Sequence, residues 1–253
     1  MSSRVALVTG GQQGIGLGIA SALVAAGFRI AIAAEVAPDV PAVVTALERL
    51  GGNARYFRHD MRDVDRVGAL LDDVEATMGP VTTLVSNAGV GAPVRGDMLD
   101  LKPGNFDFVL SVNLRGAFFL AQETARRMTA RAAETPRSII FITSVSADMV
   151  SVERAEYCIS KAGAAMMAQL FAARLAADGI SVFDVRPGII ETGMTEGVRD
   201  KYTARIKDGL VPAARWGTPE DIGAAVLPLA EGRFAFATGT VIAADGGLSI
   251  ARL

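Results

Sequence analysis

The sequence predicts an α/β protein with a doubly wound, seven-stranded parallel sheet flanked by helices. Short apolar, often β-branched runs alternate with longer amphipathic stretches almost to the end of the 253-residue chain. These runs are nearly continuously apolar, as expected for parallel strands that are buried on both faces. Since no repeat, low-complexity tract or Pro- and Ser-rich linker divides the chain, residues 1–253 are predicted to form a single domain.

The predicted elements follow one another in the order that right-handed β-α-β crossovers produce. Gly51 and Gly52 end the second predicted helix and Gly179 ends the fifth, because glycine adopts the conformation that closes a helix. The predicted strands are Val5–Val8, Arg29–Ala34, Ala54–Arg58, Thr83–Ser86, Ser138–Thr143, Ser181–Arg186 and Thr240–Ala243, and the predicted helices cover residues 15–26, 40–50, 63–78, 104–131, 153–177 and 218–230.

The longest segment without a clear period covers residues 188–211 and contains Gly193, Gly197 and Gly209. It follows the sixth predicted strand, at the sheet edge where open α/β proteins bind their ligands. Irregular segments of this length in compact domains are usually functional. We therefore expect a substrate lid here, although an ordinary surface loop would fit the same residues.

Composition excludes several classes of protein. The formal charge is −2 and no long basic run occurs, so nucleic acid is not the expected partner. Cys158 is the only cysteine and His59 the only histidine, so neither a disulfide nor a His- or Cys-based metal centre is expected. The start of the chain lacks the apolar core of a signal peptide, and no stretch of about 18 apolar residues occurs. A cytoplasmic protein without membrane segments is expected.

A glycine-rich turn, TGGQQGIG, connects the first predicted strand to the first helix. Gly10, Gly14 and Gly16 permit a tight turn, close backbone approach to a pyrophosphate and close helix–strand packing. The helix N-terminus adds unpaired N–H groups and a favourable dipole, which Gln13 and Ile15 would border. Glycines also end strands for conformational reasons alone, but this position predicts a Rossmann-like dinucleotide site.

A second group of residues has the chemistry of proton transfer. Tyr157 and Lys161 are four positions apart in a predicted helix, so their side chains share one face. A neighbouring cation favours the phenolate form of a phenol, which suits it to exchange a proton with an alcohol or a carbonyl. Ser144 follows a predicted strand, thirteen residues before Tyr157, with Ser146 as a nearby alternative. A surface tyrosine and lysine one turn apart would also fit this spacing.

Taken together and in this order, the motifs resemble those of the short-chain dehydrogenase/reductase family, including its 3-oxoacyl-carrier-protein reductases. The resemblance spans the chain through Thr9–Gly16, Asn87-Ala88-Gly89, Asn113, Ser144, Tyr157-x-x-x-Lys161, Pro187-Gly188 and Asp245-Gly246-Gly247. It implies that Tyr157 is the catalytic acid or base, that Ser144 holds the substrate oxygen and that Lys161 approaches the cofactor ribose. It also implies that Asn113 interrupts its helix and holds a water linked to Lys161, and that the chain forms a homo-oligomer, either a dimer or a tetramer.

The same resemblance assigns further cofactor contacts. It implies that Asp60 and Met61 contact the adenine and that Asn87, Ala88 and Gly89 line the floor under the adenosine ribose. A helix N-cap is the alternative role for Asp60. The segment expected at the nicotinamide carboxamide contains Pro187, Gly188, Ile190 and Thr192.

The end of the second predicted strand bears on the choice of dinucleotide. NAD-using relatives end this strand with an acidic residue that binds the ribose 2′-hydroxyl; here Ala34 holds that position and Glu35 follows. A 2′-phosphate would meet the Glu35 carboxylate and no obvious cation, which favours NAD(H) over NADP(H). Arg29 or Arg58 could still reach the site.

The predicted function is that of an oxidoreductase that interconverts an alcohol and a ketone by hydride transfer, on a small-molecule substrate. Either a 3-oxoacyl-carrier-protein reductase or a sugar or polyol dehydrogenase fits, and a dinucleotide-binding regulator without catalysis is a third reading. Glu153, Arg154 and Glu156 either rim the substrate entrance or form an exposed first helical turn. We find no conspicuous basic cluster for an acidic carrier protein, and the only local candidate is Arg126, Arg127 and Arg131.

Overall fold

The computed structural model describes residues 4–132 and 134–252. Its seven strands form a single parallel sheet in the order β3-β2-β1-β4-β5-β6-β7. The order reverses next to β1, which is the arrangement of a doubly wound sheet and confirms the predicted fold class. The strands are β1 (Val5–Thr9), β2 (Arg29–Ala34), β3 (Ala54–Arg58), β4 (Val81–Ser86), β5 (Arg137–Ile142), β6 (Ile180–Pro187) and β7 (Val241–Ala244).

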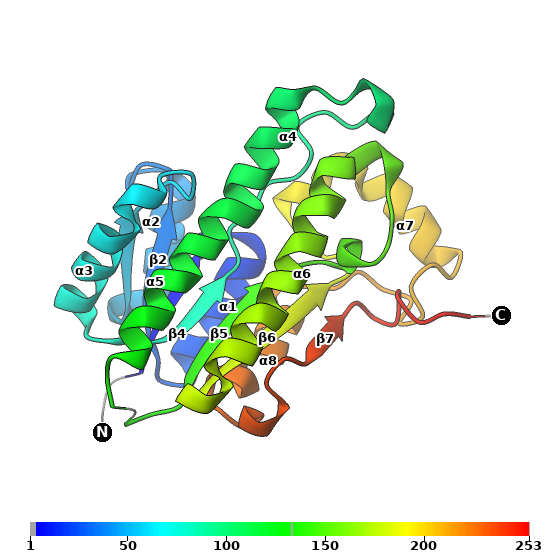
Figure 1. Cartoon of the computed structure of the whole chain (residues 1–253). Coiled ribbons are helices and arrows are strands. Elements are labelled where there is room, and N and C mark those ends of the chain that lie inside the picture. Colours follow the sequence, from blue (N-terminus) through cyan, green and yellow to red (C-terminus); the bar gives the residue numbers. More distant parts are fainter. Residues whose placement is uncertain (1–3, 133, 253) are drawn as a thin grey trace.

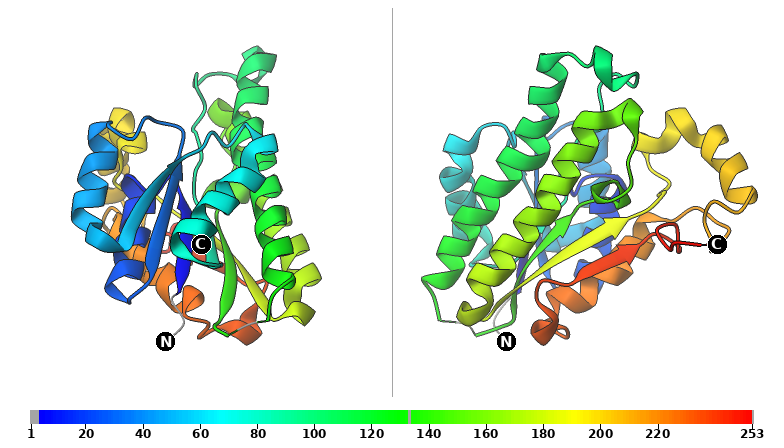
Figure 2. Two further views of the ribbon diagram at one scale, coloured as in Figure 1. Left: turned by 90° about the vertical axis from the view of Figure 1, so that its left-hand side faces the viewer. Right: turned by 45° about the vertical axis from the view of Figure 1, so that its right-hand side comes forward.

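Helices cover both faces of the sheet (Figures 1 and 2). On one face lie α1, α2 and α8, and on the other lie α3, α5 and α6, so the molecule has three layers. The helices are α1 (Gly14–Ala25), α2 (Pro41–Leu50), α3 (Val67–Met78), α4 (Pro103–Leu110), α5 (Ala117–Thr129), α6 (Ala155–Leu175), α7 (Arg199–Lys207) and α8 (Pro219–Ala230).

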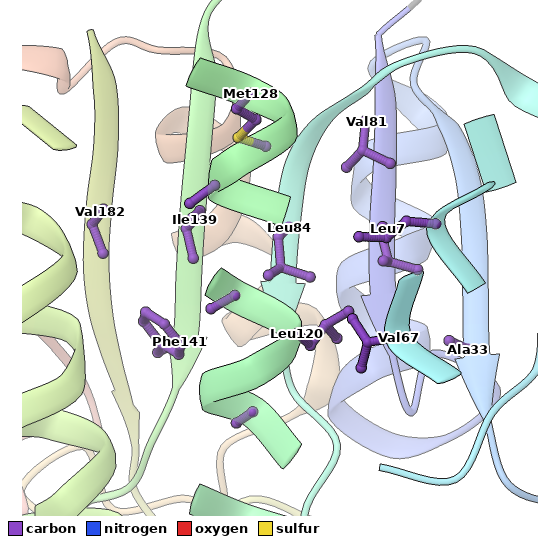
Figure 3. Packing of buried hydrophobic residues seen from close by; sticks show 14 of the residues in the cluster. Leu7, Ala33, Val67, Val81, Leu84, Leu120, Met128, Ile139, Phe141 and Val182 are labelled. Carbon is purple, nitrogen blue, oxygen red and sulfur yellow. The ribbon is translucent and has the colours of Figure 1, made fainter. Parts of the chain in front are cut away.

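The two faces of the sheet carry separate hydrophobic cores, because alternate residues of a strand point in opposite directions. In β1, Val5 and Leu7 join the core under α3, α5 and α6, whereas Ala6 and Val8 join the core under α1, α2 and α8. Figure 3 shows part of the first core, where Leu120 of α5 packs beside Leu84 and Val67. Burial on both faces explains why the strand sequences are almost continuously apolar.

The helix predicted over residues 104–131 is interrupted in the structure. α4 ends at Leu110, the π-helical turn Ser111–Gly116 follows, and α5 begins at Ala117. The wider turn places the Asn113 side chain against the backbone of Val90, with which it exchanges two hydrogen bonds. This polar contact replaces regular helical geometry, and π-turns of this kind occur frequently at functional sites.

The segment 188–211 is more regular than predicted. It contains a 3₁₀ helix at Gly193–Val198 and the helix α7. The sequence of α7, RDKYTARIK, buries only Ile206 and therefore shows no apolar period that would predict a helix. Within the described part of the chain, no helix has the length and apolar character needed to cross a membrane.

A capping box fixes the start of α8, which packs against α1. The Thr218 hydroxyl accepts a hydrogen bond from the Asp221 N–H at 3.3 Å, and the Asp221 carboxylate accepts one from the Thr218 N–H at 2.8 Å. Arg215 donates to both Asp221 oxygens at 2.7 and 2.9 Å. The Arg215 and Thr218 hydrogen bonds hold the pKa of Asp221 down to about 2.

We expect Asp221→Ala to lower the free energy of unfolding at pH 7 by about 1 kcal/mol, the usual cost of a lost cap. That corresponds to about 2–4 °C in Tm for a chain of this size. Because the folded pKa lies below the ordinary value of 3.8, the stabilisation is complete above that value and is lost as the pH falls toward about 2. Thermal melts at pH 7 and between pH 4 and 2 test this, with Glu220→Gln in the same turn as the control. A Tm difference independent of pH would contradict the assignment.

Candidate active site

The turn between β1 and α1 has the shape of a phosphate cradle. Gly10 and Gly14 have φ of +66° and +51°, values that side chains other than glycine rarely adopt. A Cβ atom on Gly16 would lie 2.2 Å from the Gly10 carbonyl oxygen, so only glycine fits there. The N-cap residue Gln13 makes no side-chain capping bond, which leaves the first N–H groups of α1 available to an anion. These residues fit a dinucleotide pyrophosphate.

Asn87, which follows β4, fixes this turn from the neighbouring strand. Its side-chain amide donates to the Thr9 carbonyl at 2.9 Å, and its N–H donates to the Thr9 hydroxyl at 3.0 Å. The N–H of Ala88 donates to the same hydroxyl at 2.9 Å. The Asn87 side chain thus holds together the two strand ends on either side of the point where the strand order reverses.

Tyr157, Lys161 and Ser144 lie together at the carboxyl ends of β5 and β6. Tyr157 and Lys161 occupy the first turns of α6, and the Lys161 Nζ lies 5.7 Å from the centre of the Tyr157 ring. The same Nζ donates to the Ile142 carbonyl at 3.0 Å, which fixes the buried ammonium. The Ser144 hydroxyl accepts a hydrogen bond from the Ser146 N–H at 3.0 Å. The predicted phenol, ammonium and hydroxyl are therefore neighbours in the fold.

Asn113 lies behind this group. Its side-chain oxygen accepts from the Val90 N–H at 2.8 Å, and its amide donates to the Val90 carbonyl at 2.9 Å and to the Ser160 hydroxyl at 3.1 Å. A Cβ atom on Gly89 would lie 3.2 Å from the Asn113 oxygen and 3.6 Å from the Lys161 Nζ. Asn113 and Lys161 therefore approach the same glycine from two helices.

A cleft of about 690 Å³ brings these parts together. It runs from the glycine-rich turn past Tyr157 to α7. Asn113 is absent from its wall, while the lining includes the other predicted site residues, namely Gly10, Gln13, Gly14, Ile15, Gly16, Glu35, Asp60, Met61, Asn87, Ala88, Gly89, Ser144, Tyr157, Lys161, Pro187, Gly188, Ile190 and Thr192.

Glu35 and Asp60 lie at the end of the cleft where β2 and β3 terminate. Glu35 is exposed, and its backbone carbonyl accepts from the Arg58 side chain at 3.0 Å. Arg62, which the sequence analysis did not single out, donates to both Asp60 oxygens at 2.6–3.0 Å. This hydrogen bonding lowers the pKa of Asp60. Arg29 is remote from the cleft, since it donates to the carbonyls of Met78 and Thr77.

The segment after β6 also lines the cleft. Gly188 approaches Asp245 so closely that a Cβ atom on it would lie 2.7 Å from the Asp245 Cα. Ile190 is buried and pairs with Gly217 in a parallel bridge. Thr192 caps the following 3₁₀ helix and lies beside Gly14, where a Cβ atom would meet its methyl group at 3.4 Å. Thr192 therefore borders the glycine-rich turn.

Three arginines line the cleft, namely Arg95, Arg154 and Arg205. Arg154 was expected either to rim the substrate entrance or to lie in an exposed helical turn, whereas Arg95 and Arg205 were not singled out from the sequence. The earlier candidates Arg127 and Arg131 are instead ion-paired with Glu75, near the start of β4. Of the residues before Tyr157, Glu156 is buried and Arg154 faces the cleft. These arginines come from three separate segments, so only the fold brings them together.

The geometry agrees with comparisons to known proteins. A family described as enoyl-(acyl carrier protein) reductase, within the short-chain dehydrogenases/reductases, matches residues 10–249. The chain belongs to the short-chain dehydrogenase/reductase family. The enzyme is accordingly an oxidoreductase that acts on CH–OH groups with NAD or NADP.

Named relatives differ in the substrates that their names give. The chain is similar to a crystal structure of 3-oxoacyl-[acyl-carrier protein] reductase from Brucella melitensis in complex with NAD, at 50% identity and a TM-score of 0.95 over 100% of both chains. It is 35% identical to the 3-oxoacyl-[acyl-carrier-protein] reductase MabA of Mycobacterium bovis, over 98% of this chain and 94% of that one. It is also 31% identical to the 2-dehydro-3-deoxy-D-gluconate 5-dehydrogenase of Pseudoalteromonas atlantica, over 98% and 96%. The family is shared, whereas the substrates are not.

Proposed function

We propose that the enzyme interconverts a secondary alcohol and a ketone, with Tyr157 as the group that exchanges the proton. The observation that carries this proposal is the placement of Tyr157, Lys161 and Ser144 in one cleft with the glycine-rich turn. The phenol supplies a proton to the carbonyl oxygen in the reducing direction and removes the hydroxyl proton in the oxidising direction. NAD(H), when bound, supplies or accepts the hydride.

The other residues hold Tyr157 and the substrate in position. The Ser144 hydroxyl donates a hydrogen bond to the substrate oxygen and keeps it beside the phenol. The Lys161 ammonium, 5.7 Å from the phenol ring, stabilises the phenolate. Asn113 keeps the π-turn in place and holds a water that connects Lys161 to solvent. In this scheme the chain's own residues bind the oxygen, move the proton and return it to water.

The cofactor-binding roles follow the cleft from end to end. Gly10, Gln13, Gly14, Ile15 and Gly16 bind the pyrophosphate through backbone N–H groups. Each Asp60 oxygen accepts two hydrogen bonds from Arg62, and the Arg62 Nε–H is shared between both oxygens. The adenine amino group, beside Met61, would take the place of this shared hydrogen bond on one oxygen. The ribose and nicotinamide contacts belong to the remaining lining residues, namely Asn87, Ala88, Gly89, Tyr157, Lys161, Pro187, Gly188, Ile190 and Thr192.

Turnover assays test the proposed reaction directly. The purified enzyme is incubated with NAD⁺ and a panel of polyols and hydroxy acids, and separately with NADH and ketones or 3-oxoacyl thioesters, while absorbance of the reduced nicotinamide is followed. We expect turnover of at least one substrate pair in both directions. Tight dinucleotide binding without turnover of any substrate would instead identify a non-catalytic dinucleotide-binding protein.

We propose that NAD(H) is preferred to NADP(H). Glu35 is exposed at the end of β2, where a carboxylate can accept hydrogen bonds from the adenosine ribose hydroxyls. Of the neighbouring cations, Arg62 is ion-paired with Asp60, and Arg58, which donates to the Glu35 carbonyl, is not among the residues that line the cleft. A 2′-phosphate would therefore meet a carboxylate before it met a free cation.

We expect Glu35→Gln to weaken NADH binding by about 10-fold, the effect of a lost hydrogen bond to a charged group. NADPH binding should improve in the same variant, because the repulsive charge is removed. Titrations followed by nicotinamide fluorescence measure both dissociation constants, with the exposed Glu48→Gln on α2 as control. Tighter binding of NADPH by the unmodified enzyme would refute the preference and assign the 2′-phosphate to Arg58 or Arg62.

We further propose that residues 188–211 act as a substrate lid. Met194 and Tyr202 of that segment line the cleft, which supports this role.

We also propose that the protein is a cytoplasmic homo-oligomer. Phe119, Met166 and Leu170 are exposed apolar side chains on α5 and α6, which supports packing against another copy as a dimer or homotetramer. A chain with one cysteine does not depend on an oxidising compartment. Light scattering measures the assembly.

A further inference from the structure

Charge is unevenly distributed along the cleft. Its lining contains five cationic side chains and two carboxylates. The carboxylates, Glu35 and Asp60, both lie at the end formed by β2 and β3, and Asp60 is neutralised by Arg62. Around Tyr157 and α7 the charged lining residues are Arg95, Arg154, Lys161 and Arg205. The half of the cleft beyond the glycine-rich turn is therefore positively charged.

Arg154 is the cation beside the reacting group. It precedes α6, and its guanidinium carbon lies 5.3 Å from the centre of the Tyr157 ring. Its hydrogen bonds within the described chain are long, at 3.4 Å to the hydroxyls of Ser146 and Ser151. Among the described residues no carboxylate lies within the 4.0 Å of an ion pair. A half-buried guanidinium thus faces the cleft with N–H donors to spare.

Other buried or half-buried arginines of the fold are engaged, which makes Arg154 distinctive. Arg186, at the end of β6, is ion-paired with Asp184 and Asp148, and Arg127 with Glu75. Arg154 has two carboxylates close in sequence but contacts neither, since Glu153 is exposed and Glu156 is buried in the first turn of α6. The positive charge of Arg154 is therefore available to an anionic ligand in the cleft.

Two neighbouring segments add positive charge near Arg154. The loop that carries Arg95 is tied to the start of α6, because the Gly96 N–H donates to the Glu153 carbonyl at 3.3 Å. Arg205 reaches the cleft from α7, which lies at the same end of the sheet as the start of α6 (Figure 1). Both arginines are exposed, so they act mainly by attracting an anion into the cleft. Arg154, closest to Tyr157, is placed to bind it.

We propose that the substrate is a small hydroxy acid or oxo acid, with its carboxylate bound by Arg154 while Tyr157 and Ser144 hold the reacting oxygen. This proposal rests on the proposed function of the same cleft. In the oxidising direction the alcohol carbon loses hydride to NAD⁺ and the hydroxyl loses its proton to Tyr157, so the carboxylate is unchanged. In a 3-oxoacyl-carrier-protein substrate, the phosphate of the thioester arm lies far from the keto group. Because Arg154 lies next to the Tyr157 phenol, it is better placed to bind the carboxylate of a short acid.

Matched substrate pairs test the charge requirement. We would compare kcat/KM for 3-hydroxybutyrate with 3-hydroxybutyramide, and for gluconate with gluconamide, and assay 3-oxobutyryl-N-acetylcysteamine as the thioester. Because a bidentate guanidinium–carboxylate contact is a strong, directional interaction, we expect the acid of a reactive pair to exceed its amide by about 10- to 100-fold. An amide or thioester used as well as the acid would overturn the proposal while leaving the oxidoreductase function intact.

Variants assign the effect to Arg154. Arg154→Met keeps side-chain length and should remove the preference for acid over amide, mainly through KM, whereas Arg154→Lys should keep part of it. Arg174→Met changes an exposed arginine on the same helix that is ion-paired with Asp178, and should leave the preference unchanged. An acid preference that survives Arg154→Met would overturn the assignment. The acid-to-amide comparison on the unmodified enzyme stands even if a variant fails to fold.

A binding measurement separates this proposal from the reaction itself. A carboxylate without a hydroxyl, such as isobutyrate, should raise the Tm of the NADH-saturated enzyme, and isobutyramide should not. Arg154→Met should abolish the rise. If no substrate is turned over but the carboxylate effect is present, the proposed reaction fails and the anion site stands. If NADH binds and the carboxylate has no effect, the anion site is refuted.

Discussion

Replacing Tyr157 by phenylalanine should reduce kcat by about 100- to 10,000-fold, the range over which positioned proton transfer contributes to catalysis. The phenylalanine ring keeps the stacking partners of the tyrosine, since Arg154 and Lys161 lie 5.3 and 5.7 Å from the ring centre. Packing should therefore survive, and NADH binding should weaken by no more than about 10-fold, the effect of the one hydrogen bond that the phenol would lose to the cofactor ribose. The decrease in kcat is then due to the missing hydroxyl group.

Steady-state kinetics and a fluorescence titration of the same preparation measure these two quantities. Tyr202→Phe is the matched control, because Tyr202 lies in α7 at the far end of the cleft and its ring packs edge-on against Trp216. It should lose far less of kcat than Tyr157→Phe does. A Tyr157→Phe enzyme with the unmodified rate would place the proton on another group, with Ser144 as the first to examine.

Much of the fold was predictable because both faces of the sheet are buried. β2 and β3 have the predicted bounds, since β2 is an apolar run of strand length and β3 follows the Gly51-Gly52 stop directly. α7 could not be predicted from a helical spacing of apolar residues, because Ile206 is its only buried residue. The π-turn around Asn113 came from the family resemblance, and a helical period alone predicts a continuous helix there.

The candidate active site was also predictable only in part. Tyr157, Lys161 and Ser144 are close in sequence or follow one strand, so their meeting could be expected. Arg62 lies two residues from Asp60, and a test for nearby charge pairs would have found that ion pair. For Arg154 the sequence left two places open, the substrate entrance or an exposed helical turn, and Arg205 lies in the segment expected to form a lid. That both line one cleft depends on how α6 and α7 pack, and the spacing of residues does not decide this.

Replacing Gly16 by alanine should abolish measurable dinucleotide binding, weakening it by 100-fold or more, that is by about 3 kcal/mol, the upper end of the cost of overpacking. The added Cβ atom would lie 2.2 Å from the Gly10 carbonyl oxygen and 2.7 Å from the Asn87 amide nitrogen. Neither atom can move aside without a large energetic cost, because the first belongs to the backbone and the second donates a hydrogen bond to the Thr9 carbonyl at 2.9 Å. The turn must open, and its N–H groups would no longer converge on a pyrophosphate.

The same clash should lower the Tm, by about 2–4 °C for each kcal/mol of overpacking. Gly68→Ala in α3 is the control, because a Cβ atom there meets nothing within 4 Å and alanine favours a helix. It should leave NADH binding unchanged and the Tm equal or higher. If Gly16→Ala lost stability yet bound NADH as the unmodified enzyme does, the turn would be a packing element only. The pyrophosphate would then have to lie elsewhere in the cleft, and the roles assigned to Gly10, Gly14 and the N-terminus of α1 would fall with it.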